Sequence, residues 1–209
     1  MSEIAPHPFE TVRKAETADV RETATALAKA FYDDPVMQWF FPSDRRMPRL
    51  DRGFTVFLQR IYLRYGETYT LDGRVGGALW APPGKWHVGP LGQLRLLPRM
   101  MNAFGRDLPK LMRGITFIES KHPDEPHYYL AVLGVEPESQ GKGLGAALMR
   151  PVLDRCDRER LPAYLEASSA RSRELYLRNG FEVVEEINMP GGGPPAWRMW
   201  RDPRPPAEP

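Results

Sequence analysis

Apolar and polar positions alternate with two different periods along the first half of the chain. Apolar residues recur every three to four positions in two stretches, which is typical of amphipathic helices. Shorter β-rich runs predict a first strand and then a hairpin that turns at Asp72-Gly73. Asp34-Pro35 is expected to end the first helix. The predicted helices cover 18–32 and 48–65, and the predicted strands cover 9–14, 67–71 and 74–81.

The second half alternates strand-like and helix-like stretches more regularly. Strands are predicted at 127–135, 162–167, 181–187 and 196–201, and helices at 144–158 and 170–179. A strand–helix–strand order favours an α/β fold with a parallel or mixed sheet.

Residues 90–118 are predicted to form a helical insertion. Leucines and methionines mix there with arginines and lysines, and Pro98 and Pro109 are expected to break the segment into pieces. The basic stripe is interpreted as a solvated helix face, with an anionic partner as the alternative.

Composition narrows the functional classes. The 209 residues fit one domain, and 29 basic against 27 acidic residues favour neither a nucleic-acid nor a membrane partner. A single cysteine, Cys156, excludes an internal disulfide, and the four histidines lack a metal-type spacing, so no metal is predicted. The N-terminus does not resemble a signal peptide, which predicts a cytoplasmic protein. The Pro-rich tail 202–209 is expected to be disordered.

Three closely spaced glycines stand where the strand 127–135 leads into a helix. A nucleotide P-loop does not fit, because Glu136 replaces its first glycine and Gly143 its hydroxyl residue. Gly141 to Ala146 matches a dinucleotide fingerprint, but too few helices follow for a doubly wound fold. The third interpretation is a diphosphate cradle for acyl-CoA, and a bare turn is the alternative. The cradle would use backbone N–H groups of Gln140, Gly141, Lys142, Gly143, Leu144, Gly145 and Ala146.

Two motifs in this region resemble a known family. Leu133-x-Val135-x-Pro137-x-x-Gln140-Gly141-x-Gly143-x-Gly145 resembles motif A of the GCN5-related N-acetyltransferases, and Tyr176-x-x-x-Gly180-Phe181 resembles their closing element. Within the superfamily, "EPHYYLAVLGVEPESQGKGLG", "PAYLEASSARSRELYLRNGF" and "PPAWRMWR" resemble the puromycin N-acetyltransferase group. The resemblance covers 127–187. It implies one domain over 1–209, a central twisted mixed sheet of six to seven strands flanked by helices, and acetyl-CoA as the acetyl donor.

The resemblance also implies roles for individual residues. Leu133, Gly134 and Val135 lie on a strand that separates from its neighbour and pairs with the pantetheine arm, and the N–H of Val135 would polarise the thioester carbonyl. Tyr176 would protonate the departing sulfur, with a core tyrosine as the alternative. Ser169 stands where many members have an asparagine that contacts pantetheine.

The base is less well defined by the sequence. Glu166 ends the strand 162–167, where a carboxylate could take the proton of the amine directly or through water. A structural carboxylate is the alternative, and His127 and Asp33 are further candidates for the base. Substrate contacts are expected from Phe31, Tyr32, Asp33, Trp39, Trp80 and Tyr129, and Trp86 is a further candidate.

These observations predict an acetyl-CoA-dependent N-acetyltransferase acting on a small-molecule primary amine, such as an aminonucleoside or another antibiotic-like amine. The alternatives are acetylation of a protein amine and a domain that binds acyl-CoA without chemistry. A homodimer is left open.

Overall fold

The structure, a computed structural model, describes residues 11–42 and 45–204. Its centre is a seven-stranded sheet with the order β1-β2-β3-β4-β5-β7-β6. Only β4 and β5 are parallel neighbours, which confirms a mixed sheet. The strands are β1 (Val12–Lys14), β2 (Thr68–Leu71), β3 (Gly76–Ala81), β4 (Tyr128–Val135), β5 (Ala163–Ala167), β6 (Glu182–Asn188) and β7 (Pro195–Arg201).

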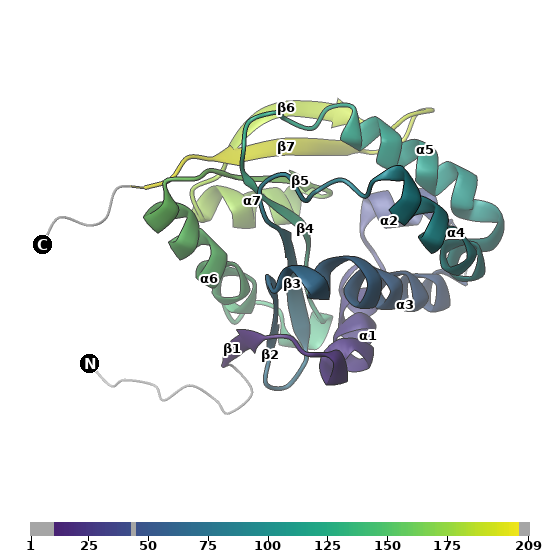
Figure 1. The fold of residues 1–209 in the computed structure, drawn as a ribbon, viewed down its shortest axis with the longest axis horizontal. Helices are drawn as coiled ribbons and strands as arrows, with labels where there is room; N and C mark the ends of the chain where they lie inside the picture. Colours follow the sequence, from purple (N-terminus) through teal and green to yellow (C-terminus); the bar gives the residue numbers. More distant parts are fainter. Residues whose placement is uncertain (1–10, 43–44, 205–209) are drawn as a thin grey trace, which may run out of the picture.

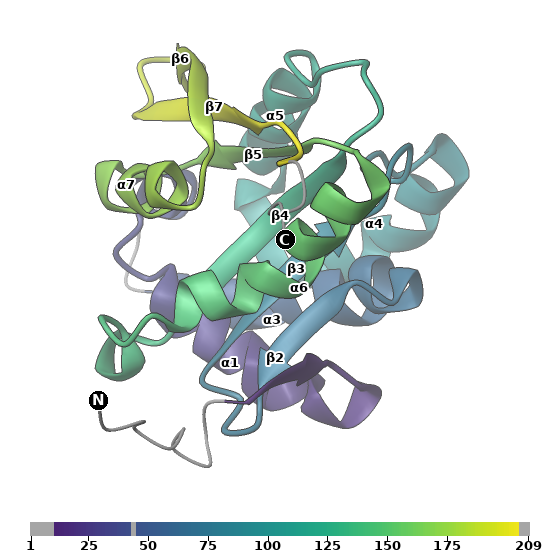
Figure 2. The same cartoon turned by 90° about the vertical axis from the view of Figure 1, so that its left-hand side faces the viewer.

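Helices cover both faces of this sheet. Figures 1 and 2 show α6 on one face and α1, α3, α4 and α5 on the opposite side, while α7 contacts β5 and β6. None of the helices within the described ranges is long and apolar enough to cross a membrane. The helices are α1 (Val20–Ala30), α2 (Pro35–Phe40), α3 (Arg46–Phe57), α4 (Pro90–Phe104), α5 (Leu108–Glu119), α6 (Leu144–Glu159) and α7 (Ala170–Arg178).

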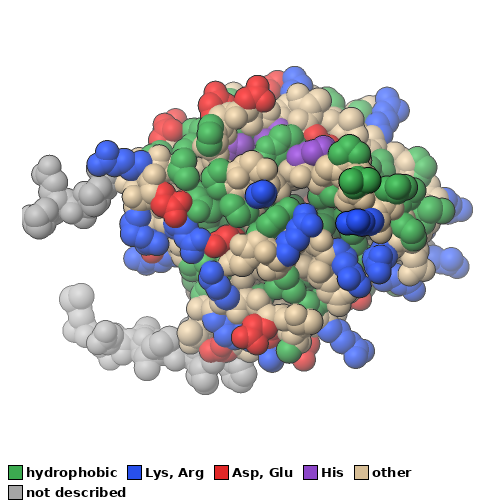
Figure 3. All heavy atoms as spheres, viewed as in Figure 1, with side chains coloured by type: hydrophobic (Ala, Val, Ile, Leu, Met, Phe, Trp, Pro, Cys, Tyr) green, Lys and Arg blue, Asp and Glu red, His purple; other side chains and the backbone are tan. Residues whose placement is uncertain are grey.

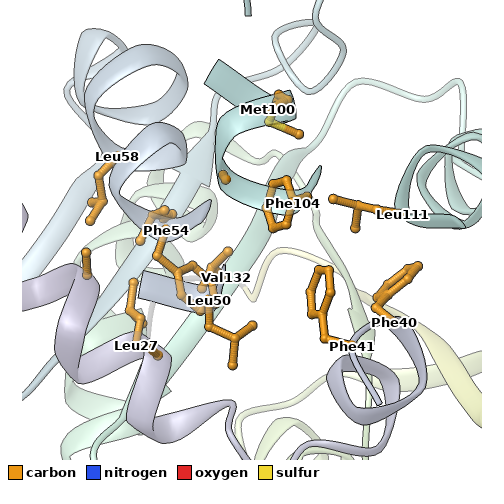
Figure 4. Close-up of a cluster of buried hydrophobic side chains, with 14 of the residues drawn as sticks. Leu27, Phe40, Phe41, Leu50, Phe54, Leu58, Met100, Phe104, Leu111 and Val132 are labelled. Atoms are coloured by element: carbon orange, nitrogen blue, oxygen red, sulfur yellow. The ribbon is translucent and has the colours of Figure 1, made fainter. Parts of the chain in front are cut away.

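The sheet separates two hydrophobic cores. Leu79 and Val132 face the core beneath α1 to α5, where Leu27, Phe54 and Phe104 meet (Figure 4). Their neighbours in the strands, Ala78 and Trp80 among them, face the core beneath α6. The alternation of side chains along a strand therefore sorts the residues of β3 and β4 between two buried faces.

Most predicted elements are confirmed, and the differences have local causes. Helix α2 was not predicted: α1 ends at Ala30, and Asp34 caps a second helix, because its Oδ1 accepts from the N–H groups of Val36 and Met37, both at 3.0 Å. Residues 9–10 of the first strand and 205–209 of the tail lie outside the described residues.

The predicted break at Pro98 was wrong. Helix α4 runs through Pro98 and ends before Gly105, whose φ is 52°. Pro98 removes the hydrogen bond to the carbonyl of Leu94, and both residues are exposed, so water can bind that carbonyl. Pro109 lies in the first turn of α5, where a missing N–H costs nothing.

Candidate active site

Strands β4 and β5 separate halfway along their length. They pair only through Tyr128–Leu130 and Ala163–Leu165, although β4 continues to Val135 and β5 to Ala167. On its other edge, β4 stays paired with β3 as far as Val135. The opening confirms the strand separation that the resemblance implied.

The register of β4 determines which backbone groups face this opening. The N–H of Glu136 donates to the carbonyl of Val75 at 2.8 Å, so Glu136 is bonded toward β3. Because bonded and non-bonded pairs alternate in an antiparallel ladder, the N–H and C=O groups of Leu133 and Val135 point away from β3. The side-chain amide of Gln140 donates to the Val135 carbonyl at 2.8 Å. The Val135 N–H therefore faces the opening from the same edge.

The glycine-rich loop joins β4 to α6. Gly141 and Gly143 have φ values of 82° and 79°, and a Cβ at either position would meet nothing within 4 Å, so the loop borders open space. Within residues 11–42 and 45–204 no side chain caps α6, so the N–H groups of its first turn are available to bind an anion. The loop thus has the backbone geometry of a diphosphate cradle.

Two other glycines of the motif serve packing. A Cβ on Gly134 would lie 2.9 Å from the Cβ of Ala30, so this glycine lets α1 lie directly on β4. A Cβ on Gly145 would lie 3.2 Å from Cδ2 of Leu175 in α7. Both glycines bring helices close to the opening.

A cavity of about 560 Å³ lies beside the opening, on the face covered by α1 to α5. Its walls are mainly apolar and come from several helices, with Phe40, Phe57, Ile61, Leu97, Leu111 and Ile115 as examples. Figure 3 shows histidine side chains among hydrophobic ones on the face that carries α4 and α5. The polar part of the lining includes Glu166, His122, Tyr129, Ser168 and Tyr176, together with Tyr62, Gln93 and Glu119.

Glu166 is the buried carboxyl of this cavity. Its Oε2 accepts from the hydroxyl of Tyr129 at 2.9 Å, whereas its buried Oε1 has no hydrogen-bond partner within the described part of the chain. Burial raises the pKa of Glu166 to about 7, and the hydrogen bond from Tyr129 opposes this shift. A carboxyl with this pKa can both accept and release a proton near neutral pH.

Tyr176 enters the cavity from α7. Burial raises its pKa above the ordinary value of a phenol, and the charge of Asp34 adds to the shift. The hydroxyl therefore stays protonated, and it has no hydrogen-bond partner among residues 11–42 and 45–204. A free, protonated phenol of this kind is suited to donate a proton.

Asp34 and Ser168 were not predicted as site residues. The Ser168 hydroxyl donates to Oδ2 of Asp34, and burial raises the pKa of that carboxyl. An Asp before Pro could have suggested the helix cap, but its partner lies 134 residues away in the sequence. Together they connect α2 to the end of β5 beside Tyr176.

The comparisons with known proteins agree with this geometry. The model of the acetyltransferase (GNAT) family matches residues 80–181. A solved "histone acetyltransferase HPA2 and related acetyltransferase" from Corynebacterium glutamicum is 28% identical with a TM-score of 0.70, over 95% of this chain and 98% of that chain. These matches support membership of the GNAT superfamily. The chain is an acetyltransferase.

Two curated relatives of this GNAT protein resemble it over different lengths. An uncharacterized N-acetyltransferase of Schizosaccharomyces pombe is 26% identical over 188 residues, which are 85% of this chain and 76% of the yeast protein. Mycothiol acetyltransferase of Beutenbergia cavernae is 42% identical over 67 residues, only 31% of this chain and 23% of that protein.

Members of the GNAT family use acetyl-CoA, and the residues present fit it. The open loop at Gly141 and Gly143 offers N–H groups to a diphosphate, and the free edge of β4 offers backbone groups to the pantetheine arm. Ser169 caps α7, since its Oγ accepts from the N–H of Ser172 at 3.2 Å. If Ser169 also contacts pantetheine as predicted, the same hydroxyl must serve both the helix cap and the cofactor.

The structure brings only some of the predicted substrate residues to the cavity of this GNAT protein. Phe31, Tyr129 and Trp86 line it. Trp80 does not: it is fully buried in the core beneath α6, because its position in β3 turns it to the other face of the sheet.

The other three predicted contacts lie outside the cavity lining. The Tyr32 ring lies 5.0 Å from the guanidinium of Arg46. Trp39 lies 4.3 Å from the ammonium of Lys110, which also donates to the Trp39 carbonyl. Asp33 is exposed, whereas its neighbour Asp34 accepts a hydrogen bond from Ser168, which lines the cavity.

Proposed function

We propose that the protein transfers the acetyl group of acetyl-CoA to the primary amine of a small, largely apolar molecule. The observation that carries this proposal is the position of Glu166. This carboxyl lies in the wall of an apolar cavity, beside the opening between β4 and β5. An amine held in the cavity would meet a base at the same place where a strand edge is free.

The chain supplies a group for each proton and charge in the reaction. Glu166 takes a proton from the ammonium, and its pKa of about 7 matches this role near neutral pH. Acetyl-CoA supplies an acetyl thioester. The Val135 N–H donates a hydrogen bond to the thioester oxygen as the amine attacks, and Tyr176 donates its proton to the departing sulfur. The nitrogen loses its second proton as the intermediate collapses, and that proton restores the Tyr176 phenol, so the products are the amide, the CoA thiol and the proton held by Glu166.

The walls of the cavity favour an apolar monoamine over a polycation. Phe40, Ile61 and Leu111 would bury the body of an aryl or alkyl group, at about 25 cal/mol per Å² removed from water. A second cation would have to enter this apolar wall without a partner, which costs several kcal/mol. Glu119, the other carboxyl of the lining, already has a neighbour, because its Oε1 lies 3.4 Å from Nδ1 of His87.

The walls of the cavity also help to decide between a small-molecule amine and a protein amine as the substrate. The Corynebacterium relative is named a histone acetyltransferase and related acetyltransferase. A lysine on a protein requires an open groove for the neighbouring backbone, whereas this cavity is bordered by α2, α4 and α5. The apolar walls contributed by these helices therefore favour a small molecule.

The test is acetylation of an amine panel with release of free thiol as the readout. The panel contains phenethylamine, a linear alkylamine, an aminonucleoside antibiotic, agmatine and a lysine peptide. The expected result is the highest kcat/KM among the apolar monoamines or the aminonucleoside. Acetylation of the aminonucleoside would further predict resistance of cells that express the protein. Preference for the peptide would overturn the proposal.

A further inference from the structure

A pair of buried histidines lies directly behind Glu166. Nε2 of His122 lies 2.9 Å from Nε2 of His127, and Nδ1 of His127 lies 2.6 Å from the backbone carbonyl of Glu125. The side chain of His122 is only 2% exposed and stacks on Trp86 with ring centres 3.8 Å apart. Neither histidine has a role in the reaction proposed above.

The hydrogen bonds determine where the protons of this pair lie. A carbonyl can only accept, so Nδ1 is the protonated nitrogen of His127. Nε2 of a neutral His127 is then an acceptor, and Nε2 of His122 must donate to it. A neutral imidazole has one N–H, so Nδ1 of His122 carries a bare lone pair. That nitrogen lies 3.9 Å from Oε1 of Glu166.

Two acceptors therefore face each other at the bottom of the cavity. Oε1 of Glu166 is the oxygen without a hydrogen-bond partner in the described residues. A carboxylate oxygen and an imidazole lone pair repel each other, whereas a proton on Oε1 turns the contact into an O–H···N hydrogen bond after a small rotation of the carboxyl. The arrangement favours the protonated carboxyl, which is the state that forms when Glu166 takes a proton from an amine.

We propose that His122, held in this tautomer by His127 and the Glu125 carbonyl, strengthens Glu166 as a base by accepting a hydrogen bond from its protonated form. The proposal rests on the proposed function, because it assigns His122 a role in the proton transfer from the substrate. His122 is a positioning residue that acts through Glu166, and His127 acts through His122.

Other titratable and charged groups face this site from the neighbouring elements. Tyr129 in β4 donates to Oε2 and favours the ionised carboxyl, and Arg198 in β7 does the same through its charge. Tyr164 in β5 packs against His122 and accepts from Arg198, and the charge of Glu166 also reaches Tyr62 after α3. Glu119 in α5 pairs with His87.

The pKa values of the two groups agree with this arrangement. Burial and the neighbouring His127 lower the pKa of His122 to about 3, which keeps the imidazole neutral. The pKa of Glu166 is raised to about 7, so a proton taken up by the pair is held by the carboxyl and not by His122.

The test measures the pKa of Glu166 in the protein without substrates, by NMR of ¹³C-labelled carboxyl groups. His122→Phe keeps a ring against Trp86 but removes the lone pair. His127→Phe leaves His122 in place but frees it to turn its N–H toward Glu166. The expected result is a pKa of Glu166 lower by about one unit or more in both variants. The acidic limb of kcat/KM for phenethylamine should move by the same amount.

His87→Phe is the matched control, since His87 is partly exposed and contacts Glu119 instead. It should leave the pKa of Glu166 unchanged. An unchanged pKa in folded His122→Phe and His127→Phe would overturn the proposal. If His122→Phe does not fold, His127→Phe decides alone. Imidazole ¹⁵N chemical shifts of the wild type report the tautomer of His122 and provide a second test. A proton on Nδ1 of neutral His122 would also overturn the proposal. Neither NMR result depends on turnover, so a wild type that acetylates no amine counts against the proposed function only.

Discussion

At the residue scale, the carboxyl of Glu166 opposes the stability of the fold. Its pKa is about 7 in the folded protein and about 4.5 in an unfolded chain. The folded state therefore binds more protons between these values, and stability is lost as pH rises from about 4.5 through about 7. Above pH 7 the fold contains a buried charge that it would be more stable without.

Glu166→Gln should consequently raise Tm at pH 8 and reduce activity. The amide keeps an acceptor for Tyr129 and offers a donor to Nδ1 of His122, and it removes a charge penalty on the order of 2–3 kcal/mol. Acetylation of strongly basic amines should fall by about 10²–10⁴-fold. A weakly basic arylamine, which arrives neutral, should lose much less.

The Glu166→Gln prediction is checked by thermal melts at pH 5 and pH 8 and by kcat/KM for both amine classes. Glu119→Gln is the control, because it removes the other carboxyl at the cavity. A lower Tm at pH 8 and equal losses for both amines would instead indicate a structural carboxylate.

The wild-type rate should depend on pH in the same direction. Because Glu166 must be ionised to accept a proton from the ammonium, kcat/KM for phenethylamine should level off near pH 8 and fall about tenfold per unit below pH 6. A profile without an acidic limb between pH 5 and pH 8 would be incompatible with a base of this pKa.

Tyr176→Phe should lower kcat far more than it weakens acetyl-CoA binding. The hydroxyl has no partner among the described side chains, so its removal should cost little stability, whereas the departing sulfur loses its proton donor. A decrease of about 10²–10⁴-fold is expected in steady-state kinetics. Tyr62→Phe, on another wall of the same cavity, is the control and should stay near wild type. Equal rates for both variants would make Tyr176 a core residue.

The sequence pointed to Glu166 and Tyr176, which the structure places in the cavity lining, but it did not predict the residues around them. Motif spacing determines their positions, whereas Asp34 and His122 meet their partners only through tertiary structure. Trp80 was misassigned because every residue of β3 is buried, so alternation alone cannot tell which core a side chain enters.

At the element scale, the start of α6 carries the predicted cradle. Gly143→Val would place a branched side chain at a φ of 79°, over a surface that is now open. We expect a rise of about tenfold or more in the Kd of CoA by calorimetry, because the diphosphate could no longer approach the backbone N–H groups.

Gly191→Val is the matched control for backbone strain. Gly191 has a φ of 73°, a Cβ there also meets nothing within 4 Å, and it lies in the loop between β6 and β7. Similar stability losses but different CoA affinities would support the cradle. An unchanged Kd in Gly143→Val would contradict it.

The prediction of helices and strands succeeded where the hydrophobic pattern and the turn or capping residues indicated the same boundary. In 127–187 each strand meets a turn or a helix start, and the observed bounds differ from the predicted ones by one residue or so. It failed for α2, which has only six residues, and at Pro98, where an exposed helix tolerates a proline. A helix cap decides the first case, and hydration of an exposed carbonyl decides the second. Hydrophobic periodicity indicates neither interaction.

At the scale of the whole molecule, the two halves of the chain meet at the cavity. Helices α1 to α5 provide the apolar walls, and the motif region provides the strand edge, the glycine-rich loop, Glu166 and Tyr176. The resemblance covered the second half and predicted the chemistry. The walls come from the first half and the helical insertion, where the sequence pattern predicted helices but not the faces they present.

The most direct test of the central claim compares two amines of similar basicity in one assay. Phenethylamine carries one cation on an apolar body, and agmatine carries a second cation at the far end. With acetyl-CoA at saturation, the apolar walls predict a kcat/KM at least about tenfold higher for phenethylamine, which corresponds to about 1.4 kcal/mol in the transition state. Glu166→Gln should abolish most of both rates. Equal or better use of agmatine, or a preference that survives with full activity in Glu166→Gln, would contradict the account.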